Sequence, residues 1–321
     1  MRVSSTLRSR LMRKFAFPGT RFATIWRHRQ VARFRVHSAF IQGSAMQSDF
    51  LRAALQAAEA AAELIKPLYQ SNLEVHTKAD KSPVTMADVQ AENLIRSLIE
   101  DRFPAHGFYG EETGEHHRDA EYLWLVDPID GTKAFVREYP MFSTQIALMH
   151  RGQLIVGVSI APVYGELAYA EKGGGAWLNG RQIRVSDIER IEDSSVSAAN
   201  LKSLARGPLW PAFGGIVARA DRIRGYGDFL QYHLLASGRI DAVLESDVNI
   251  LDIAALAVIV EEAGGRFTDL KGKPVSLDIE DVLASNGRLH GSHDPGARAA
   301  ALFHARGAGR SGRPAPAVRA S

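Results

Sequence analysis

Residues 143–171 contain three consecutive segments in which apolar and polar side chains alternate. Alternation with a period of two is typical of strands that bury one face. The segments read STQIALMHRG, QLIVGVSIAP and GELAYAEKG, with turn residues at Gly152 and Pro162–Gly165 between them. Because such short connections join neighbouring strands, the pattern predicts an antiparallel meander. The next segment, GGGAWLNGRQIRVS, adds a hairpin with Asn179–Gly180 at its turn.

Helical patterns precede the meander. Ser48 is a candidate N-cap for a helix from Asp49 to about Leu68. Thr85 and Asp88 fit a capping box, which predicts a second helix that ends near residue 101. Beyond the hairpin, segments with the helical period alternate with segments typical of strands. This pattern predicts helices over 228–237 and 252–263 and strands over 240–244, 266–269 and 282–285.

The predicted organisation has four parts. An α+β half over residues 46–185 contains the candidate metal ligands, and an α/β half covers residues 186–295. Residues 1–45 form a basic extension, and residues 296–321 contain the end of a helix and a basic tail that we expect to be disordered. The N-terminal extension is Arg-rich and acid-free like an organellar transit peptide. The alternative, which we favour, is a start codon assigned too far upstream, with Met46 as the start.

Charge is distributed unevenly along the chain. The first 45 residues contain nine arginines, one lysine and no acid, and the last 16 contain four arginines and no acid. Since the net charge is +3, the residues between these ends have a net charge of −11. We therefore expect no nucleic acid on the folded body, although the basic ends leave an RNA-binding role open. The chain has no cysteine, which fits a cytoplasmic protein and excludes thiolate metal sites. No apolar run approaches the ~20 residues that cross a bilayer.

Acidic residues stand where predicted strands end and helices begin. A strand predicted over 122–126, which contains the apolar run LWLV, leads directly into DPIDGT, which contains Asp127 and Asp130. The segment GFYGEE, a predicted short strand, ends in Glu111 and Glu112, and Asp88 and Asp252 each begin a predicted helix. Carboxylate and carbonyl oxygens are the ligands that Mg²⁺ prefers, and paired carboxylates can flank two ions ~3.5–4 Å apart. Taken singly, each acid also fits a turn, a helix cap or a solvated surface pair.

Together these segments resemble a known family. GEE, WLVDPIDGTKAF and LDIAALAVIVEEAGG are similar to the three signature blocks of the inositol monophosphatase superfamily of Mg²⁺-dependent, Li⁺-sensitive phosphatases. SPVTMADVQAE and KGGGAWLNGRQIRVS match two further blocks, and the resemblance spans about residues 48–292. It implies a layered αβαβα sandwich, commonly a homodimer, that hydrolyses a small phosphate monoester.

The resemblance also implies a role for each site residue. Glu111, Asp127 and the Ile129 carbonyl would bind a first Mg²⁺. Asp127, Asp130 and Asp252 would bind a second, and Glu111 would help to hold a third, weaker ion. Thr132, hydrogen-bonded to Asp88, would orient the attacking water. The backbone N–H groups of Gly131 and Thr132 would hold the phosphate.

The resemblance is greatest to the histidinol-phosphatase branch. Lys133 after Asp-Gly-Thr and the segment GYGDFLQYH, which contains Asp228, are similar to that branch. Glu245 matches a substrate-contact position of the family. Two simpler interpretations remain open: Asp228 as a helix N-cap and Lys133 as a solvated charge. Leu251, where the family often has tryptophan, and Phe229–Leu230 depart from the pattern, so inositol 1-phosphate and 3′-phosphoadenosine 5′-phosphate remain alternative substrates.

Overall fold

The computed structural model describes residues 47–71, 75–77 and 83–290. The described residues all belong to one compact unit. The interpretations of residues 1–45 and 296–321 therefore lie outside the described residues. Within the described part, no helix is both long enough and apolar enough to cross a membrane.

Helices and strands fall into two groups along the chain. The first group is α3 (Asp49–Ile65), β1 (Val75–Thr77), β2 (Pro83–Thr85), α4 (Met86–Glu100), β3 (Gly107–Gly110), β4 (Gly114–His116), β5 (Tyr122–Asp130), α5 (Thr132–Val136), β6 (Ser143–His150), β7 (Gln153–Ala161), β8 (Glu166–Glu171), β9 (Ala176–Leu178) and β10 (Arg181–Ile183). The second group is η2 (Ile191–Asp193), β11 (Ser195–Ala199), α6 (Lys202–Arg206), α7 (Trp210–Arg219), β12 (Arg222–Arg224), α8 (Asp228–Ala236), β13 (Ala242–Ser246), α9 (Ile250–Glu262), β14 (Arg266–Thr268) and β15 (Asp281–Ser285).

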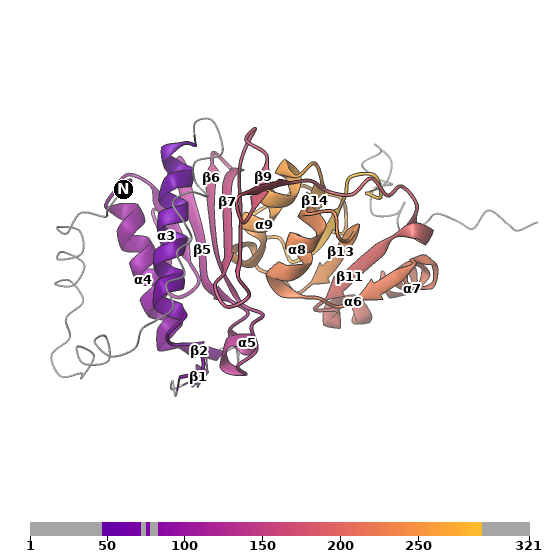
Figure 1. The fold of residues 1–321 in the computed structure, drawn as a ribbon, viewed down its shortest axis with the longest axis horizontal. Helices are drawn as coiled ribbons and strands as arrows, with labels where there is room; N and C mark the ends of the chain where they lie inside the picture. The colour runs from indigo at the N-terminus through magenta and orange to yellow at the C-terminus, as the bar shows by residue number, and fades with distance from the viewer. Residues whose placement is uncertain (1–46, 72–74, 78–82, 291–321) are drawn as a thin grey trace, which may run out of the picture. The chain divides into compact units, whose positions relative to one another are not determined.

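Apart from β1 and β2, which form a two-stranded sheet by themselves, the strands of each group form one sheet. The first sheet has eight strands in the order β10-β9-β8-β7-β6-β5-β3-β4, and the second has five in the order β12-β11-β13-β15-β14. Helices α3 and α4 cover one face of the first sheet, and α8 and α9 lie between the two sheets (Figure 1). Helices α6 and α7 cover the outer face of the second sheet. The result is the layered αβαβα sandwich that the sequence resemblance implied.

Alternation along the strands explains the layers. In β13, Ala242 and Leu244 pack into the cluster under α7, whereas Val243 between them faces α8 and α9. Helix α9 packs against both sheets and buries almost all of its side chains. A helix in that position has no solvated face, which explains why its sequence is apolar all round.

Most predicted elements are present, with shifted ends. The meander is β6, β7 and β8, and the Asn179–Gly180 hairpin joins β9 to β10. The cap at Ser48 is confirmed, since its Oγ accepts the Leu51 N–H at 3.1 Å. The strand predicted over 122–126 continues through both acids to Asp130, and the helix predicted from 252 begins at Ile250. The sequence prediction omitted β1, β2, β4, α5, η2, β11, α6, α7 and β12.

Candidate active site

A change of register in β5 places two aspartates on one face of the first sheet. Asp127 pairs with Gln145 of β6, and Asp130 pairs with Ser143, so three steps along β5 match two steps along β6. The extra residue is a β-bulge, and it cancels the alternation that would otherwise direct residues three apart to opposite faces. The Ile129 N–H donates to Asp127 Oδ1 at 2.9 Å within the bulge. Both carboxylates therefore project toward the same point.

Helix α9 brings a third carboxylate to that point. Asn249 is its N-cap, and Asp252 is the N3 partner of a capping box. Asp252 Oδ2 accepts the Asn249 N–H at 3.0 Å. Oxygen atoms of Asp127, Asp130 and Asp252 all lie within 4.8 Å of one another. These three side chains form what we call the carboxylate cluster.

The carboxylate cluster is electrostatically unfavourable by itself. Burial raises the pKa of Asp127 well above its usual value, and the charges of Glu111, Asp130 and Asp252 raise it further. Burial also raises the pKa of Asp130, with the charges of Asp228 and Asp252 acting in the same direction. For Asp252, burial raises the pKa to about 6, although its hydrogen bond from the Asn249 backbone opposes the shift. A cation at this point would remove the repulsion.

The donor set fits a hard divalent cation. Every side chain of the carboxylate cluster offers oxygen, and the chain has no cysteine. Glu111 follows the end of β3 and interacts with Asp127 through its charge and a side-chain hydrogen bond. Oxygen-only donor sets of this kind suit Mg²⁺, which binds carboxylates and retains several waters.

Asp88 and Thr132 meet beside the bulge. The Thr132 hydroxyl lies 3.4 Å from Asp88 Oδ1 and 3.0 Å from the Ile129 carbonyl oxygen, and it can donate to either. Asp88 is fully buried, and its Oδ2 accepts from the Thr85 N–H at 2.8 Å and the Thr85 hydroxyl at 2.6 Å. This capping box confirms the predicted start of α4 and leaves Oδ1 for Thr132.

Gly131 makes the turn between β5 and α5. Its φ of 87° lies in the left-handed region, and a Cβ at this position would lie 2.6 Å from the Met141 carbonyl oxygen. Only glycine accommodates both restrictions without strain. Thr132 and Lys133 follow as the first residues of α5, and the Lys133 side chain is exposed.

Two further predicted residues lie near the carboxylate cluster, on the side of the second sheet. Asp228 is the first residue of α8, but the N-cap is Gly227 and no side chain caps this helix, so the N-cap interpretation of Asp228 is wrong. Burial raises the pKa of Asp228 to about 6, and the charge of Lys133 opposes the shift. Lys133 is thus close enough to Asp228 to affect its ionisation.

Glu245, in β13, is held by three side chains that the sequence did not suggest. Tyr232 Oη and Gln231 Nε2 each donate to Oε2 at 2.6 Å, and Asn200 Nδ2 donates to Oε1 at 3.1 Å. Burial raises the pKa of Glu245 to about 8, against the effect of the hydrogen bonds from Tyr232 and Gln231. Tyr232 and Gln231 belong to α8, and Asn200 lies between β11 and α6. Because all three are distant from Glu245 in the sequence, no local sequence pattern reveals these contacts.

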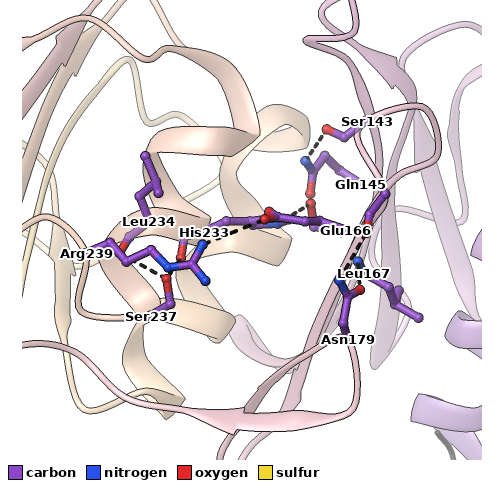
Figure 2. Close-up of polar contacts among 11 residues, drawn as sticks. Ser143, Gln145, Glu166, Leu167, Asn179, His233, Leu234, Ser237 and Arg239 are labelled. Carbon is purple, nitrogen blue, oxygen red and sulfur yellow. Dashed lines mark hydrogen bonds and ion pairs between the residues drawn. The ribbon is translucent and has the colours of Figure 1, made fainter.

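A buried polar row extends from the carboxylate cluster across the first sheet. Ser143 Oγ donates to Asp130 Oδ2 at 3.3 Å, and Gln145 Nε2 donates to Ser143 Oγ at 2.8 Å (Figure 2). The Gln145 Oε1 atom has no hydrogen-bond partner within the described part of the chain. The signal in the sequence was the occurrence of Ser143 and Gln145 on the inner face of an otherwise apolar strand.

Hydrogen bonds of His233 hold helix α8 against strands β7 and β8 of the first sheet. His233 Nδ1 lies 2.9 Å from Glu166 Oε2 in β8, and its Nε2 lies 3.0 Å from Ser159 Oγ in β7 (Figure 2). His233 is buried. Since Asp228 begins the same helix, these contacts set its position relative to the carboxylate cluster.

Comparison with known proteins identifies the class. The model of the inositol monophosphatase family matches residues 46–305. A histidinol-phosphatase from Chlorobaculum parvum is 37% identical over 240 residues, which cover 74% of this chain and 93% of that protein. An inositol-1-monophosphatase from Mesorhizobium japonicum is 34% identical over 67% of this chain and 82% of its own length. The crystal structure of the extragenic suppressor protein suhB from Bartonella henselae superposes with a TM-score of 0.72 at 31% identity, covering 80% of this chain and 100% of that one.

The fold and the carboxylate cluster thus define a phosphatase, a hydrolase of phosphoric monoesters. The chain belongs to the inositol monophosphatase family. This family is metal-dependent, and among the described residues the carboxylate cluster is a group of acids that could bind a metal.

Proposed function

We propose that this protein hydrolyses histidinol phosphate to histidinol and inorganic phosphate, the phosphatase step of histidine biosynthesis. The observation that carries the proposal is the position of Asp228, which is close enough to Asp130 to raise its pKa and close enough to Lys133 to be affected by its charge. Histidinol phosphate has an ammonium group and an imidazole, and the half-buried carboxylate of Asp228 is a suitable partner for both. The Chlorobaculum parvum relative is named a histidinol-phosphatase, which supports the same substrate.

The proposed cofactor is Mg²⁺, as two or three ions. Glu111, Asp127 and the Ile129 carbonyl hold one ion, and Asp127, Asp130 and Asp252 hold another, with Glu111 also available for a weaker third. When bound, Mg²⁺ supplies the positive charge that a phosphate dianion requires and lowers the pKa of the attacking water. The carboxylate cluster supports this proposal because neighbouring acids raise the pKa of each of its members, and a bound cation would relieve that repulsion.

The chain's own groups orient the reaction. We assign the phosphate to the N–H groups of Gly131 and Thr132, at the turn where a close backbone approach is possible. Thr132 Oγ accepts a proton from the attacking water or orients it, while Asp88 Oδ1 accepts the proton of the Thr132 hydroxyl. Asp88 itself is fixed by Thr85 and cannot turn away.

Inositol 1-phosphate is the second candidate substrate. The Mesorhizobium japonicum relative is named an inositol-1-monophosphatase. The Glu245 carboxylate can accept hydrogen bonds from ring hydroxyls as readily as it can pair with a cation. An RNA- or transcription-complex-binding role would rest on the basic ends, 1–45 and 296–321, which lie outside the described residues.

A phosphate-release panel tests the proposal. Purified protein with Mg²⁺ is given histidinol phosphate, inositol 1-phosphate, fructose 1,6-bisphosphate and 3′-phosphoadenosine 5′-phosphate, and kcat/KM is compared. We expect histidinol phosphate to exceed the others by at least about tenfold, which is the effect of a single charged contact of ~1.4 kcal/mol. A preference for inositol 1-phosphate would select the second candidate, and no turnover of any substrate by Mg²⁺-bound protein would refute both.

We further propose a homodimer that acts in the cytoplasm. Absence of cysteine fits a reducing compartment, and the dimer is the assembly that the family resemblance implies. Light scattering on the purified full chain tests the dimer, and a monomeric mass at micromolar concentration would contradict it.

A further inference from the structure

We infer that Glu92 is a positioning residue for Glu111 and so sets the affinity of the active site for its metal. This inference rests on the proposed metal site. Glu92 lies on α4 one helical turn after Asp88, and its side chain is fully buried. It points toward the hairpin that joins β3 to β4, whose turn begins with Glu111.

Both oxygens of Glu92 accept hydrogen bonds from the backbone of that hairpin. Oε2 accepts the Glu112 N–H at 2.8 Å, and Oε1 accepts the Thr113 N–H at 2.6 Å. Bonds from N–H groups to a carboxylate are about twice as strong as neutral ones. Because each oxygen holds a different residue, the carboxylate fixes the orientation of the turn as well as its distance from α4.

The hairpin is shaped to receive this carboxylate. A Cβ on Gly110 would lie 2.3 Å from Glu92 Oε1, so the absence of a side chain at Gly110 makes the contact possible. On the other side, the Glu111 N–H donates to the Val126 carbonyl oxygen of β5 at 3.2 Å. Glu111 is therefore held between β5, which carries Asp127, and the carboxylate of Glu92.

Helix α4 thus connects two parts of the active site. Asp88 accepts a hydrogen bond from Thr132. Four residues later on the helix, Glu92 accepts the N–H of Glu112, the residue after Glu111. Residues four apart lie on the same helix face, so one rigid element positions both groups. Partners that orient metal ligands in this way typically change metal affinity or activity by about 10–100-fold when they are replaced.

The test replaces Glu92 by glutamine, which keeps the shape of the side chain but presents an NH₂ group to one of the two N–H donors. We expect calorimetric Mg²⁺ affinity of Glu92→Gln to fall by about 10–100-fold. We also expect the Mg²⁺ concentration for half-maximal activity to rise in parallel, with much of kcat recovered at saturating Mg²⁺. Gly110→Ala should reproduce the same loss, because the added Cβ would displace the Glu92 carboxylate from the hairpin.

Ile95→Val is the matched control. Ile95 is a fully buried residue of the same helix, so its truncation lowers stability, by about 0.5–1.5 kcal/mol, while its apolar side chain makes none of the hydrogen bonds that hold the hairpin. This variant should bind Mg²⁺ as the wild type does. If Glu92→Gln and Gly110→Ala lose stability but keep wild-type Mg²⁺ affinity, Glu92 is only structural and the inference is overturned. If the wild type itself takes up no Mg²⁺, the proposed metal site fails and the inference fails with it, so the two failures differ in the wild-type measurement.

Discussion

Thr132 and Asp88, 44 residues apart in sequence, lie with Oγ1 and Oδ1 3.4 Å apart in the folded protein. The contact joins the first residue of α5 to the first turn of α4. The same hydroxyl lies 3.0 Å from the Ile129 carbonyl oxygen, which we propose as a metal ligand. One hydroxyl thus stands between the proposed base and the proposed metal site.

Thr132→Val should lower kcat by about 10²–10⁴-fold, the usual contribution of a positioned proton-transfer group. Valine has the same shape but no hydroxyl, so the contact with Asp88 Oδ1 is lost. Thr132→Ser is the control, because it retains the hydroxyl and should retain most of the activity. Equal activity in the valine and serine variants would remove Thr132 from the mechanism.

Asp127→Asn should reduce kcat/KM by at least about 100-fold, comparable with the loss of an electrostatic contact to the transition state. The same variant should be more stable than the wild type in EDTA, because it removes one charge from the carboxylate cluster. If the electrostatic repulsion in the carboxylate cluster falls by ~1 kcal/mol, Tm should rise by roughly 2–4 °C in a domain of about 150–250 residues. Scanning calorimetry with EDTA and with excess Mg²⁺ measures both effects, and an EDTA Tm below that of the wild type would contradict the second.

Stability of the metal-free protein should fall as pH rises. The pKa of Asp252 is raised from 3.8 in the unfolded chain to about 6 in the folded one, and those of Asp127 and Asp130 are raised well above 3.8. The folded state therefore binds more protons than the unfolded state above about pH 4, and it loses free energy of unfolding as these groups ionise. Urea titrations in EDTA between pH 4.5 and 7 measure this loss, and a flat profile would contradict it.

Mg²⁺ binding should release protons over the same range. The carboxylates must ionise to bind a cation, so apparent affinity should rise from pH 5 to pH 7 and the released protons should be detectable by calorimetry in buffers of different ionisation enthalpy. The raised pKa of Asp252, about 6, places most of its release below neutral pH. Affinity that is independent of pH would mean that the carboxylate cluster is not the metal site.

Asp228→Asn should change the choice of substrate more than the rate of hydrolysis. Loss of a hydrogen bond to a charged group costs about 1.5–3 kcal/mol, so kcat/KM for histidinol phosphate should fall by roughly 10–100-fold. Hydrolysis of inositol 1-phosphate, which has no cationic group, should change little. An equal fall for both substrates would place Asp228 in a structural role.

Part of this structure could be predicted from local patterns. The alternation of residues 143–171 predicts β6 to β8 correctly, and the capping signals at Ser48 and Thr85 locate the starts of α3 and α4. Such features depend on residues within one or two turns of each other, and one sequence contains them all. The resemblance to a family then supplies the order of layers.

The bulge in β5 explains why the predicted strand ended four residues before the observed one. Residues 127–130 contain a proline, two acids and a spacing of three, which together favour a turn. The strand continues because β6 pairs with it on both sides of the extra residue. That pairing depends on a partner strand and cannot be read from the segment alone. The same reason applies to the hydrogen bonds of Glu245 and Glu92, which depend on tertiary contacts.

Capping boxes at Asp88 and Asp252 have a consequence for the comparison of related chains. Each carboxylate uses one oxygen to close the first turn of its helix, so each acid stabilises its helix whether or not the protein is an enzyme. A relative that has lost catalysis can therefore retain acids at the positions of Asp88 and Asp252 because they stabilise its helices. Asp130 does not cap a helix. Within the described part of the chain, the hydrogen bond found for its side chain is the long one that it accepts from Ser143. Replacement of Asp130 would therefore identify a relative that is a phosphatase in fold alone more clearly than the presence of Asp88 and Asp252 identifies an active one.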